Sequence, residues 1–302
     1  DNDVDPEVPE GTEYYLPAGS SYRVTPFSLM KGFRLAGSRD GVKPVVVLEG
    51  SWSIAEGSYL SSLEFDNIEF RHEANNNYFM NTSKAYTIEN VSFVNCDFIS
   101  LRRGFWRHQS ANAKYIMNLE MEGCRFEGCG WQTSAYGTFN LQSFDKDNGV
   151  SYDQVDRAIF RNCTFSNDND GTNGYGWGNL FYAPYMDKPI ELEYKNVTIY
   201  NYSRNQRLIN IESAVGSKLV MQGILLASPC GDLYAIGANT TTTFSDNYTT
   251  ADYALGGSKM NATDLEITAD KLFADPVNGD LTIKDTSSPI VNSRAGDTRW
   301  LP

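Results

Sequence analysis

Two insertions in the sequence place aromatic side chains among glycines: GCGWQTSAYG (128–137) and SNDNDGTNGYGWGN (166–179). Aromatic faces stack on the apolar faces of sugar rings, and long loops on a rigid scaffold commonly carry binding sites. The alternative is that these rings fold back as small hydrophobic cores of the loops themselves. The predicted sugar-stacking residues are Trp131, Tyr136, Tyr175 and Trp177.

Polar residues in neighbouring predicted strands would complete such a site. Planar amides, a guanidinium group and a phenol offer hydrogen bonds that match sugar hydroxyls. The same residues also fit an ordinary solvated sheet face. The predicted polar contacts are Arg107, Asn140, Gln142, Tyr182 and Glu212.

Aligning these strands predicts which residues point inward. The alignment sets Phe79 beside Trp106 in an inward column and Met80 beside Arg107 in an outward column. It also places Asn81 and His108 on the inward side. His108 is therefore predicted to be a hydrogen-bonded core residue rather than a catalytic base.

Charged runs suggest two further kinds of ligand. The segment NDNDG gives a weak calcium candidate at Asp168 and Asp170, but it lacks the remaining ligands of an EF-hand loop, so a solvated turn is favoured and no cofactor is expected. The run RRGFWR (102–107), together with Lys114 and Arg125 if they lie nearby, suits a carboxylated glycan. It equally suits a charge-balancing edge of the fold.

Catalysis has few candidates in this sequence. A polysaccharide lyase needs a base near a neutralised carboxylate. On the outward face of the strands that carry the predicted polar contacts, only Arg107 could act as that base. A glycoside hydrolase needs a pair of carboxylates at a set separation. The acidic residues of the first strands, such as Glu120 and Glu193, are more simply explained as a solvated surface.

The elements that carry these residues repeat along the chain. LEFDNIEF (63–70), VSFVNCDF (91–98) and LEMEGCRF (119–126) share alternating apolar positions around a central Asn or Gly, and weaker copies follow at intervals of 23–39 residues. A second strand is predicted after each copy, and these strands include PVVVL (44–48), YFMNT (78–82) and FWRHQ (105–109). Alternation with period two indicates strands, and a fixed recurrence indicates stacked repeats. The sequence therefore predicts an all-β parallel β-helix of about eight coils.

The central Asn or Gly has a structural role in this prediction. Both residue types tolerate the left-handed backbone conformation of a tight bend. The next position is apolar or Cys and should point inward. Cys96, Cys124 and Cys163 occupy it, so they are predicted to be reduced core residues, although a bridge from Cys96 to Cys124 is sterically conceivable between neighbouring coils.

The composition excludes several classes of protein. The chain has 302 residues with 25 Lys and Arg against 38 Asp and Glu, a formal charge of −13. This acidic balance excludes nucleic acid as the default partner. No apolar run is long enough to cross a membrane.

Two segments carry a family resemblance: YYLPAGSSYRV…GFRLAGSRDGVKPVVVLEG (14–50) and LFADPVNGDLTIKDTSSPIVNSRAGDTRW (272–300). They resemble the first and last coils of the right-handed parallel β-helix of the pectate-lyase-like superfamily. GDTRW and FSDNYTT (244–250) also resemble secreted, lipid-anchored β-helix proteins of unknown function from Bacteroidetes polysaccharide-utilisation loci. The catalytic motifs of the polygalacturonase-like and pectate-lyase enzymes are missing.

The resemblance implies a location and partners. It implies the extracellular face of the outer membrane, a lipoprotein anchor in a segment outside this sequence, and other glycan-uptake proteins as partners. The expected organisation is a flexible acidic tail over 1–12 and a single-stranded right-handed β-helix over 13–302, with a cap from about 265. The expected function is non-catalytic binding of a plant or host polysaccharide; the alternatives are a lyase acting on a uronic-acid glycan such as pectin, and a structural or adhesive protein.

Overall fold

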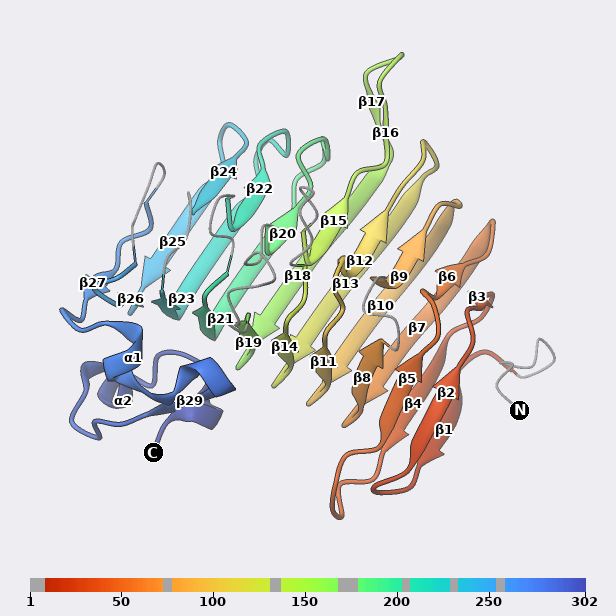
Figure 1. Ribbon diagram of the computed structural model, residues 1–302. Coiled ribbons are helices and arrows are strands. Elements are labelled where there is room, and N and C mark those ends of the chain that lie inside the picture. Colours follow the sequence, from red (N-terminus) through yellow and green to blue (C-terminus); the bar gives the residue numbers. More distant parts are fainter. Residues whose placement is uncertain are drawn as a thin grey trace.

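The computed structural model describes residues 9–72, 78–130, 137–167, 179–202, 207–228, 233–253 and 259–302. It is an all-β structure with a 17-stranded sheet and a six-stranded sheet. The chain contributes strands in a fixed order and returns to the same sheets in each repeat (Figure 1). The strands of a repeat thus pair in parallel with their counterparts in the preceding repeat.

The first strands of successive repeats lie side by side in the 17-stranded sheet. All of these strands pair in parallel with the equivalent strand of the next repeat. They are β1 (Thr12–Leu16), β4 (Phe33–Gly37), β7 (Ser58–Asp66), β10 (Tyr86–Val94), β13 (Lys114–Glu122), β18 (Asp153–Arg161), β21 (Glu191–Tyr200), β23 (Lys218–Ala227) and β25 (Thr241–Ser245).

A second strand follows in the same sheet, so the predicted single strand around each central Asn or Gly is in fact bent. In the later repeats the second strand is the continuation of β21 and β23. The separate second strands are β2 (Ser21–Val24), β5 (Val45–Leu48), β8 (Glu69–His72), β11 (Asp97–Ile99), β14 (Arg125–Glu127), β19 (Thr164–Ser166), β26 (Tyr248–Thr249) and β27 (Thr263–Asp264).

The strands predicted as the second of each repeat are in fact the third, because the bent first segment supplies two, and they build the remaining parallel sheets. The segment 44–48, predicted to belong with these strands, instead pairs as β5 with β2 and β8. The six-stranded sheet contains β9 (Tyr78–Thr82), β12 (Gly104–His108), β15 (Phe139–Leu141), β20 (Phe181–Tyr182), β22 (Ile209–Ile211) and β24 (Tyr234–Ile236). A separate pair is formed by β3 (Ser28–Leu29) and β6 (Ser53–Ile54).

The bend between first and second strands has the predicted left-handed backbone conformation at the central Asn or Gly. These residues, one per repeat, are called here the left-handed column. Asn67, Asn95, Asn162 and Asn196 all have φ between 48° and 55°, and Gly123 and Gly223 each have φ of 64°. The amide Nδ2 of Asn95 donates to Oδ1 of Asn67 at 2.6 Å. The bend is thus fixed both by backbone conformation and by a side-chain bond between repeats.

Replacement of Asn95 tests this column. Asn95→Ala is expected to destabilise the protein by about 1–2 kcal/mol because Ala strains a left-handed backbone, and Asn95→Gly should cost less because Gly adopts positive φ freely. Urea denaturation of both variants measures the difference. Equal stability of the Ala and Gly variants would contradict the assignment.

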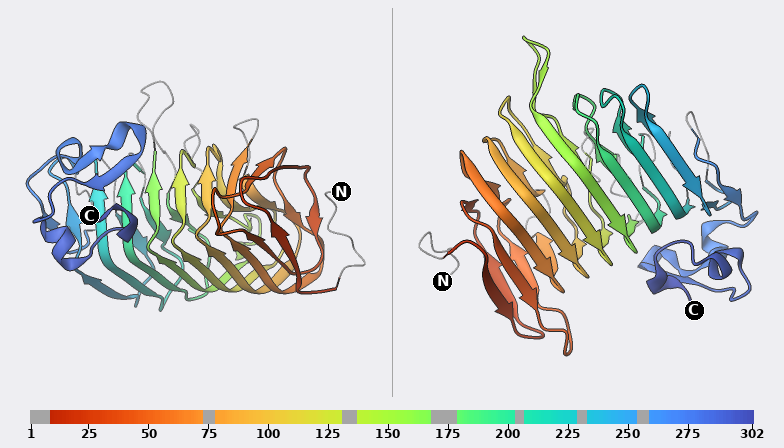
Figure 2. Two further views of the ribbon diagram at one scale, coloured as in Figure 1. Left: turned by 90° about the horizontal axis from the view of Figure 1, so that it is seen from below. Right: turned by 180° about the vertical axis from the view of Figure 1, so that it is seen from behind.

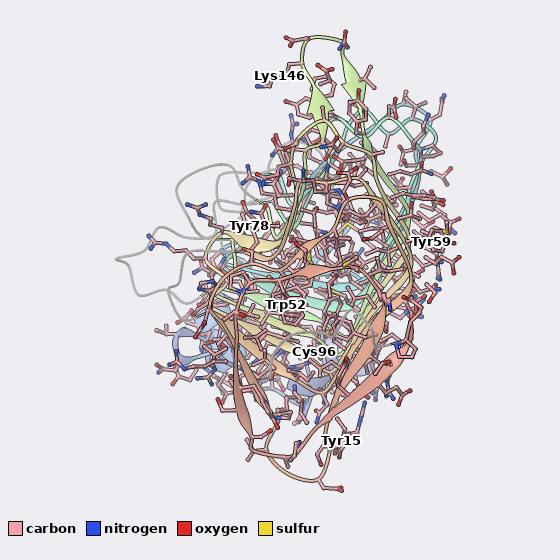
Figure 3. The ribbon with its side chains drawn as sticks, turned by 90° about the vertical axis from the view of Figure 1, so that its right-hand side faces the viewer. Tyr15, Trp52, Tyr59, Tyr78, Cys96 and Lys146 are labelled. Atoms are coloured by element: carbon pink, nitrogen blue, oxygen red, sulfur yellow. The ribbon has the colours of Figure 1, made fainter. Side chains whose placement is uncertain are left out.

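One continuous hydrophobic core fills the space between the sheets (Figure 3). Phenylalanines stack from repeat to repeat: Phe98 and Phe126 at 4.8 Å, and Phe126 and Phe165 at 4.7 Å, between ring centroids. These spacings match the distance between neighbouring strands. Cys96, Cys124, Cys129 and Cys163 are buried and free, as predicted for the first, second and fourth of them, and Cys96 and Cys124 form no bridge.

An antiparallel hairpin and a C-terminal segment depart from the repeat. The hairpin of β16 (Phe144–Asp145) and β17 (Val150–Ser151) projects beyond the sheets (Figure 2). Its sequence is the insertion that follows β15. The C-terminal elements are α1 (Ala269–Leu272), β28 (Phe273–Asp275), η1 (Pro276–Asn278), β29 (Asp280–Ile283), α2 (Pro289–Ser293) and η2 (Thr298–Trp300).

The last residues of the chain run back across several repeats. The Gly296 N–H donates to Gly223 O at 2.8 Å, and the Asp297 N–H donates to Thr198 Oγ1 at 2.9 Å. The Thr164 hydroxyl donates to Asp297 Oδ2 at 2.7 Å, and Arg299 Nη2 donates to the Gly123 carbonyl at 2.5 Å. The GDTRW segment therefore binds the flank of the sheet over four successive repeats.

Candidate functional site

A row of polar side chains crosses the outer face of the six-stranded sheet. Its members occupy neighbouring register positions on five successive strands. The flanking residues Trp106 and His108 bond to buried groups of the first-strand sheet, so the residue between them points away from the core. The row consists of Asn81, Arg107, Asn140, Tyr182 and Asn210.

The row corrects the predicted alignment at one strand. Met80 pairs with Trp106 and is fully buried, and Asn81 pairs with Arg107. The ring of Phe79 stacks on Phe105 instead, with centroids 5.1 Å apart. The predicted outward position of Met80 and the predicted inward position of Asn81 were therefore wrong by one residue.

The middle of the row leaves hydrogen-bonding capacity unused. The amide of Gln142 donates to Asn140 Oδ1 at 2.6 Å. Asn140 is only 1% exposed, and within the described chain neither its Nδ2 nor Oδ1 of Asn81 has a hydrogen-bond partner. The guanidinium carbon of Arg107 lies 5.6 Å from the centre of the Tyr78 ring. This stretch combines polar groups with an aromatic ring, as carbohydrate sites do.

Aromatic and charged groups surround the other end of the row. Burial raises the pKa of Tyr182, and Tyr185 and Glu212 raise it further, because a phenolate would be poorly solvated and repelled there. Glu212 pairs with Arg207 at 3.2 Å. Tyr185 stacks on Phe144 of the hairpin at 4.3 Å between centroids. Phe144, Tyr185 and Arg207 were not predicted, because they lie in the hairpin and in connecting segments whose arrangement depends on the stacking of repeats.

The remaining predicted ligand residues lie outside the described residues. These are the sugar-stacking candidates Trp131, Tyr136, Tyr175 and Trp177 and the calcium candidates Asp168 and Asp170. In the residues that the structure describes, no group of three or more His, Cys, Asp or Glu side chains is arranged to hold a metal.

The predicted basic cluster is smaller in the structure. Lys114 is buried at the start of β13 and donates to the carbonyls of Ser110 and Asn112. Arg125 pairs with Glu127 at 3.2 Å and lies 3.6 Å from Asp97. Neither residue therefore extends the surface around Arg107.

His108 is a core residue, as predicted. It is fully buried, with Nδ1 2.7 Å from Asp153 Oδ1 and Nε2 2.6 Å from the Tyr86 hydroxyl. Burial lowers the pKa of His108, because the imidazolium form loses hydration, and this outweighs the attraction of Asp153. A neutral ring that donates from Nδ1 and accepts at Nε2 satisfies both bonds.

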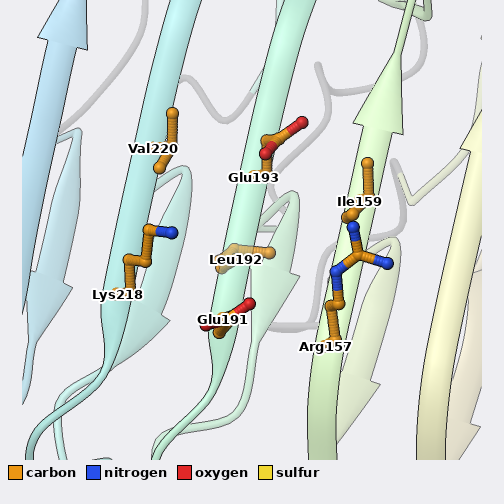
Figure 4. Close-up of a pocket in the computed structure, with 7 residues that line it drawn as sticks. All are labelled: Arg157, Ile159, Glu191, Leu192, Glu193, Lys218 and Val220. Carbon is orange, nitrogen blue, oxygen red and sulfur yellow. The ribbon is translucent and has the colours of Figure 1, made fainter.

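The acidic residues of the first strands lie among cations. Arg157 pairs with Glu120 at 2.7 Å and Arg161 with Glu193 at 3.0 Å. A hollow of about 110 Å³ opens there between β18, β21 and β23, with Ile159 and Val220 beside the charged groups (Figure 4). The ion pairs support the interpretation of these carboxylates as a solvated, charge-balanced face.

No protein-family model and no curated protein sequence matches this chain. Within the described residues, no helix is long and apolar enough to cross a membrane. The structure itself shows an all-β fold with largely parallel strands.

Proposed function

We propose that this protein binds a polysaccharide without cleaving it, and that the ligand lies across the outer face of the six-stranded sheet. The proposed scaffold is a single-stranded right-handed parallel β-helix of about eight coils, of the pectate-lyase-like kind. The strand order supports it, because every repeat returns to the same sheets in parallel.

The row from Asn81 to Asn210 is the observation that carries the proposal. Successive members are about 4.8 Å apart, the spacing of paired strands. A linear glycan lying across the strands would meet the partly exposed side chains of Asn81, Arg107 and Tyr182, while Asn140 and Asn210 are buried. Arg107 and Tyr182 supply donors and acceptors, Gln142 donates to the buried Asn140, and Glu212 lies near Tyr182.

The biological setting is proposed from the family resemblance alone. It is a Bacteroidetes cell surface, where the protein is lipid-anchored at the outer face of the outer membrane beside other glycan-uptake proteins. The undescribed loop aromatics Trp131 and Trp177 would add stacking contacts to the same ligand.

Affinity electrophoresis in gels containing plant and host polysaccharides tests the proposal. Arg107→Ala combined with Tyr182→Ala should weaken retention by roughly tenfold or more, because it removes a charged donor and a ring from the row. Arg161→Ala, on the opposite sheet, is the matched control and should bind like the native protein. Equal retention of the native protein and the row variant would contradict the proposal.

Two other outcomes identify the alternatives. Absorbance of unsaturated products from a uronic-acid glycan, lost in Arg107→Ala, would replace binding by lyase activity with Arg107 as the base. Failure of every polysaccharide to retain the native protein would favour a structural or adhesive role.

A further inference from the structure

Two tyrosines lie in one register row on the outer face of the 17-stranded sheet. Tyr59 of β7 aligns with Thr87 of β10, and Thr87 aligns with Tyr115 of β13. The tyrosines are therefore two strand spacings apart, or about 9.6 Å. Tyr59 is 57% exposed, and Figure 3 shows it at the margin of the molecule, away from the core residues Trp52 and Cys96.

Both phenols are held in the same direction. The Tyr59 hydroxyl donates to Glu89, which lies on the next strand, and the Tyr115 hydroxyl donates to Asp156, also on the next strand. Each side chain thus leans across the sheet instead of moving freely in solvent. Fixing a ring before a ligand arrives lowers the entropy lost on binding.

A strip of amides runs beside the two tyrosines. The Asn118 amide donates to Asn90 Oδ1 at 3.2 Å, and the Asn90 amide donates to the Ser61 carbonyl at 3.3 Å. These bonds orient the amides along the stack of strands and leave further donor and acceptor positions. The strip follows the direction that joins Tyr59 to Tyr115.

The charges beside the tyrosines select against an acidic ligand. Glu89 and Asp156 are the carboxylates that accept from the two phenols, and the whole chain carries a net charge of −13. Arg157, which aligns with Asn118, is already paired with Glu120. A polyuronate would be repelled by Glu89 and Asp156. A neutral sugar instead offers hydroxyl donors to the carboxylate oxygens and an apolar ring face to each tyrosine.

We propose that Tyr59, Tyr115, Asn90 and Asn118 form a second glycan site, separate from the row on the six-stranded sheet. Its ligand is a neutral linear polysaccharide with β-1,4 linkages that lies across the strands. In such a chain the same ring face returns at every second sugar, and this repeat is close to two strand spacings. Alternate sugars therefore stack on Tyr59 and Tyr115.

The test uses the Arg107→Ala/Tyr182→Ala protein, so that binding by the first site does not obscure the second. This protein is run in gels containing hydroxyethylcellulose, glucomannan or polygalacturonate. The two neutral polymers should retard it and polygalacturonate should not. Adding Tyr59→Ala and Tyr115→Ala should weaken retention by the neutral polymers by roughly tenfold or more.

Tyr15→Ala is the matched control, because Tyr15 is also a tyrosine of this sheet and is 66% exposed, but it lies outside the row. It should leave retention unchanged, and circular dichroism should show that all variants are folded. The proposal is overturned if neither neutral polymer retards the Arg107→Ala/Tyr182→Ala protein, or if the Tyr59 and Tyr115 substitutions have no more effect than Tyr15→Ala. Because the test is made in a protein that already lacks the first site, its outcome does not depend on whether the first site binds glycan. Either proposal can therefore be contradicted while the other stands.

Discussion

Phe105→Ala is expected to lower the free energy of unfolding by about 3–5 kcal/mol. The Phe105 ring is surrounded by other aromatic rings, among them Phe79, Phe98 and Phe126, whose centroids lie 5.1 Å, 4.6 Å and 5.4 Å from its own. Removing it leaves a cavity that rigid neighbouring strands cannot close. Urea denaturation followed by circular dichroism measures the loss.

Phe105→Leu and Tyr15→Ala are the controls for this substitution. Leu retains much of the buried volume and should cost clearly less than Ala. Tyr15 is largely exposed, so its removal should change stability by less than about 0.5 kcal/mol. A loss below about 1 kcal/mol for Phe105→Ala would mean that the stacked rings do not support the fold as described.

Asp153→Ala should destabilise the protein by about 2–5 kcal/mol, because each of two buried donors left without an acceptor costs about 1–3 kcal/mol. The buried carboxylate accepts bonds from the His108 ring and from the Ser143 N–H at 2.6 Å, and both donors lose their partner in the variant. Thermal and urea denaturation provide the measurement. Asp147→Ala, in the exposed hairpin, should change stability by less than about 0.5 kcal/mol.

The buried hydrogen bond between His108 and Asp153 also predicts how the stability of the protein depends on pH. The pKa of His108 is lowered in the folded protein, so below the ordinary value of about 6.5 the unfolded chain binds a proton that the folded chain does not. Stability should therefore fall as the pH decreases from about 6.5 towards 5. In His108→Gln this part of the dependence should be absent. Parallel slopes for the native protein and the variant would contradict the assignment.

The left-handed column and the inward cysteines could be predicted because each follows from a local property of the chain. Asn67 and Asn95 mark a bend that only a few residue types tolerate, and Cys96 follows in an alternating strand. Such properties recur in each repeat, so several weak patterns reinforce one another. The parallel order of strands follows from the same recurrence.

Other features depend on contacts between distant residues. Tyr78, Phe79 and Met80 are all buried, so β9 has no alternation from which its register could be read, and the alignment failed there by one residue. The stack of Phe144 on Tyr185 joins turns of successive repeats, and no local pattern indicates it. The polar row was predicted in part: in the sequence Asn140 lies between the apolar Phe139 and Leu141, and Arg107 follows the apolar Trp106.

The binding of GDTRW along the flank has a consequence for how the molecule comes apart. In a stack of repeats each unit contacts only its neighbours, so an end can fray one unit at a time. Here Arg299 reaches Gly123, 176 positions earlier in the chain, and so ties the last residues to the middle of the stack. For the C-terminal repeats to unfold, this contact must break first. The C-terminal repeats are therefore expected to unfold together in one step and not one repeat at a time. Such a tie raises the barrier to unfolding and resists proteolysis of the terminal repeats.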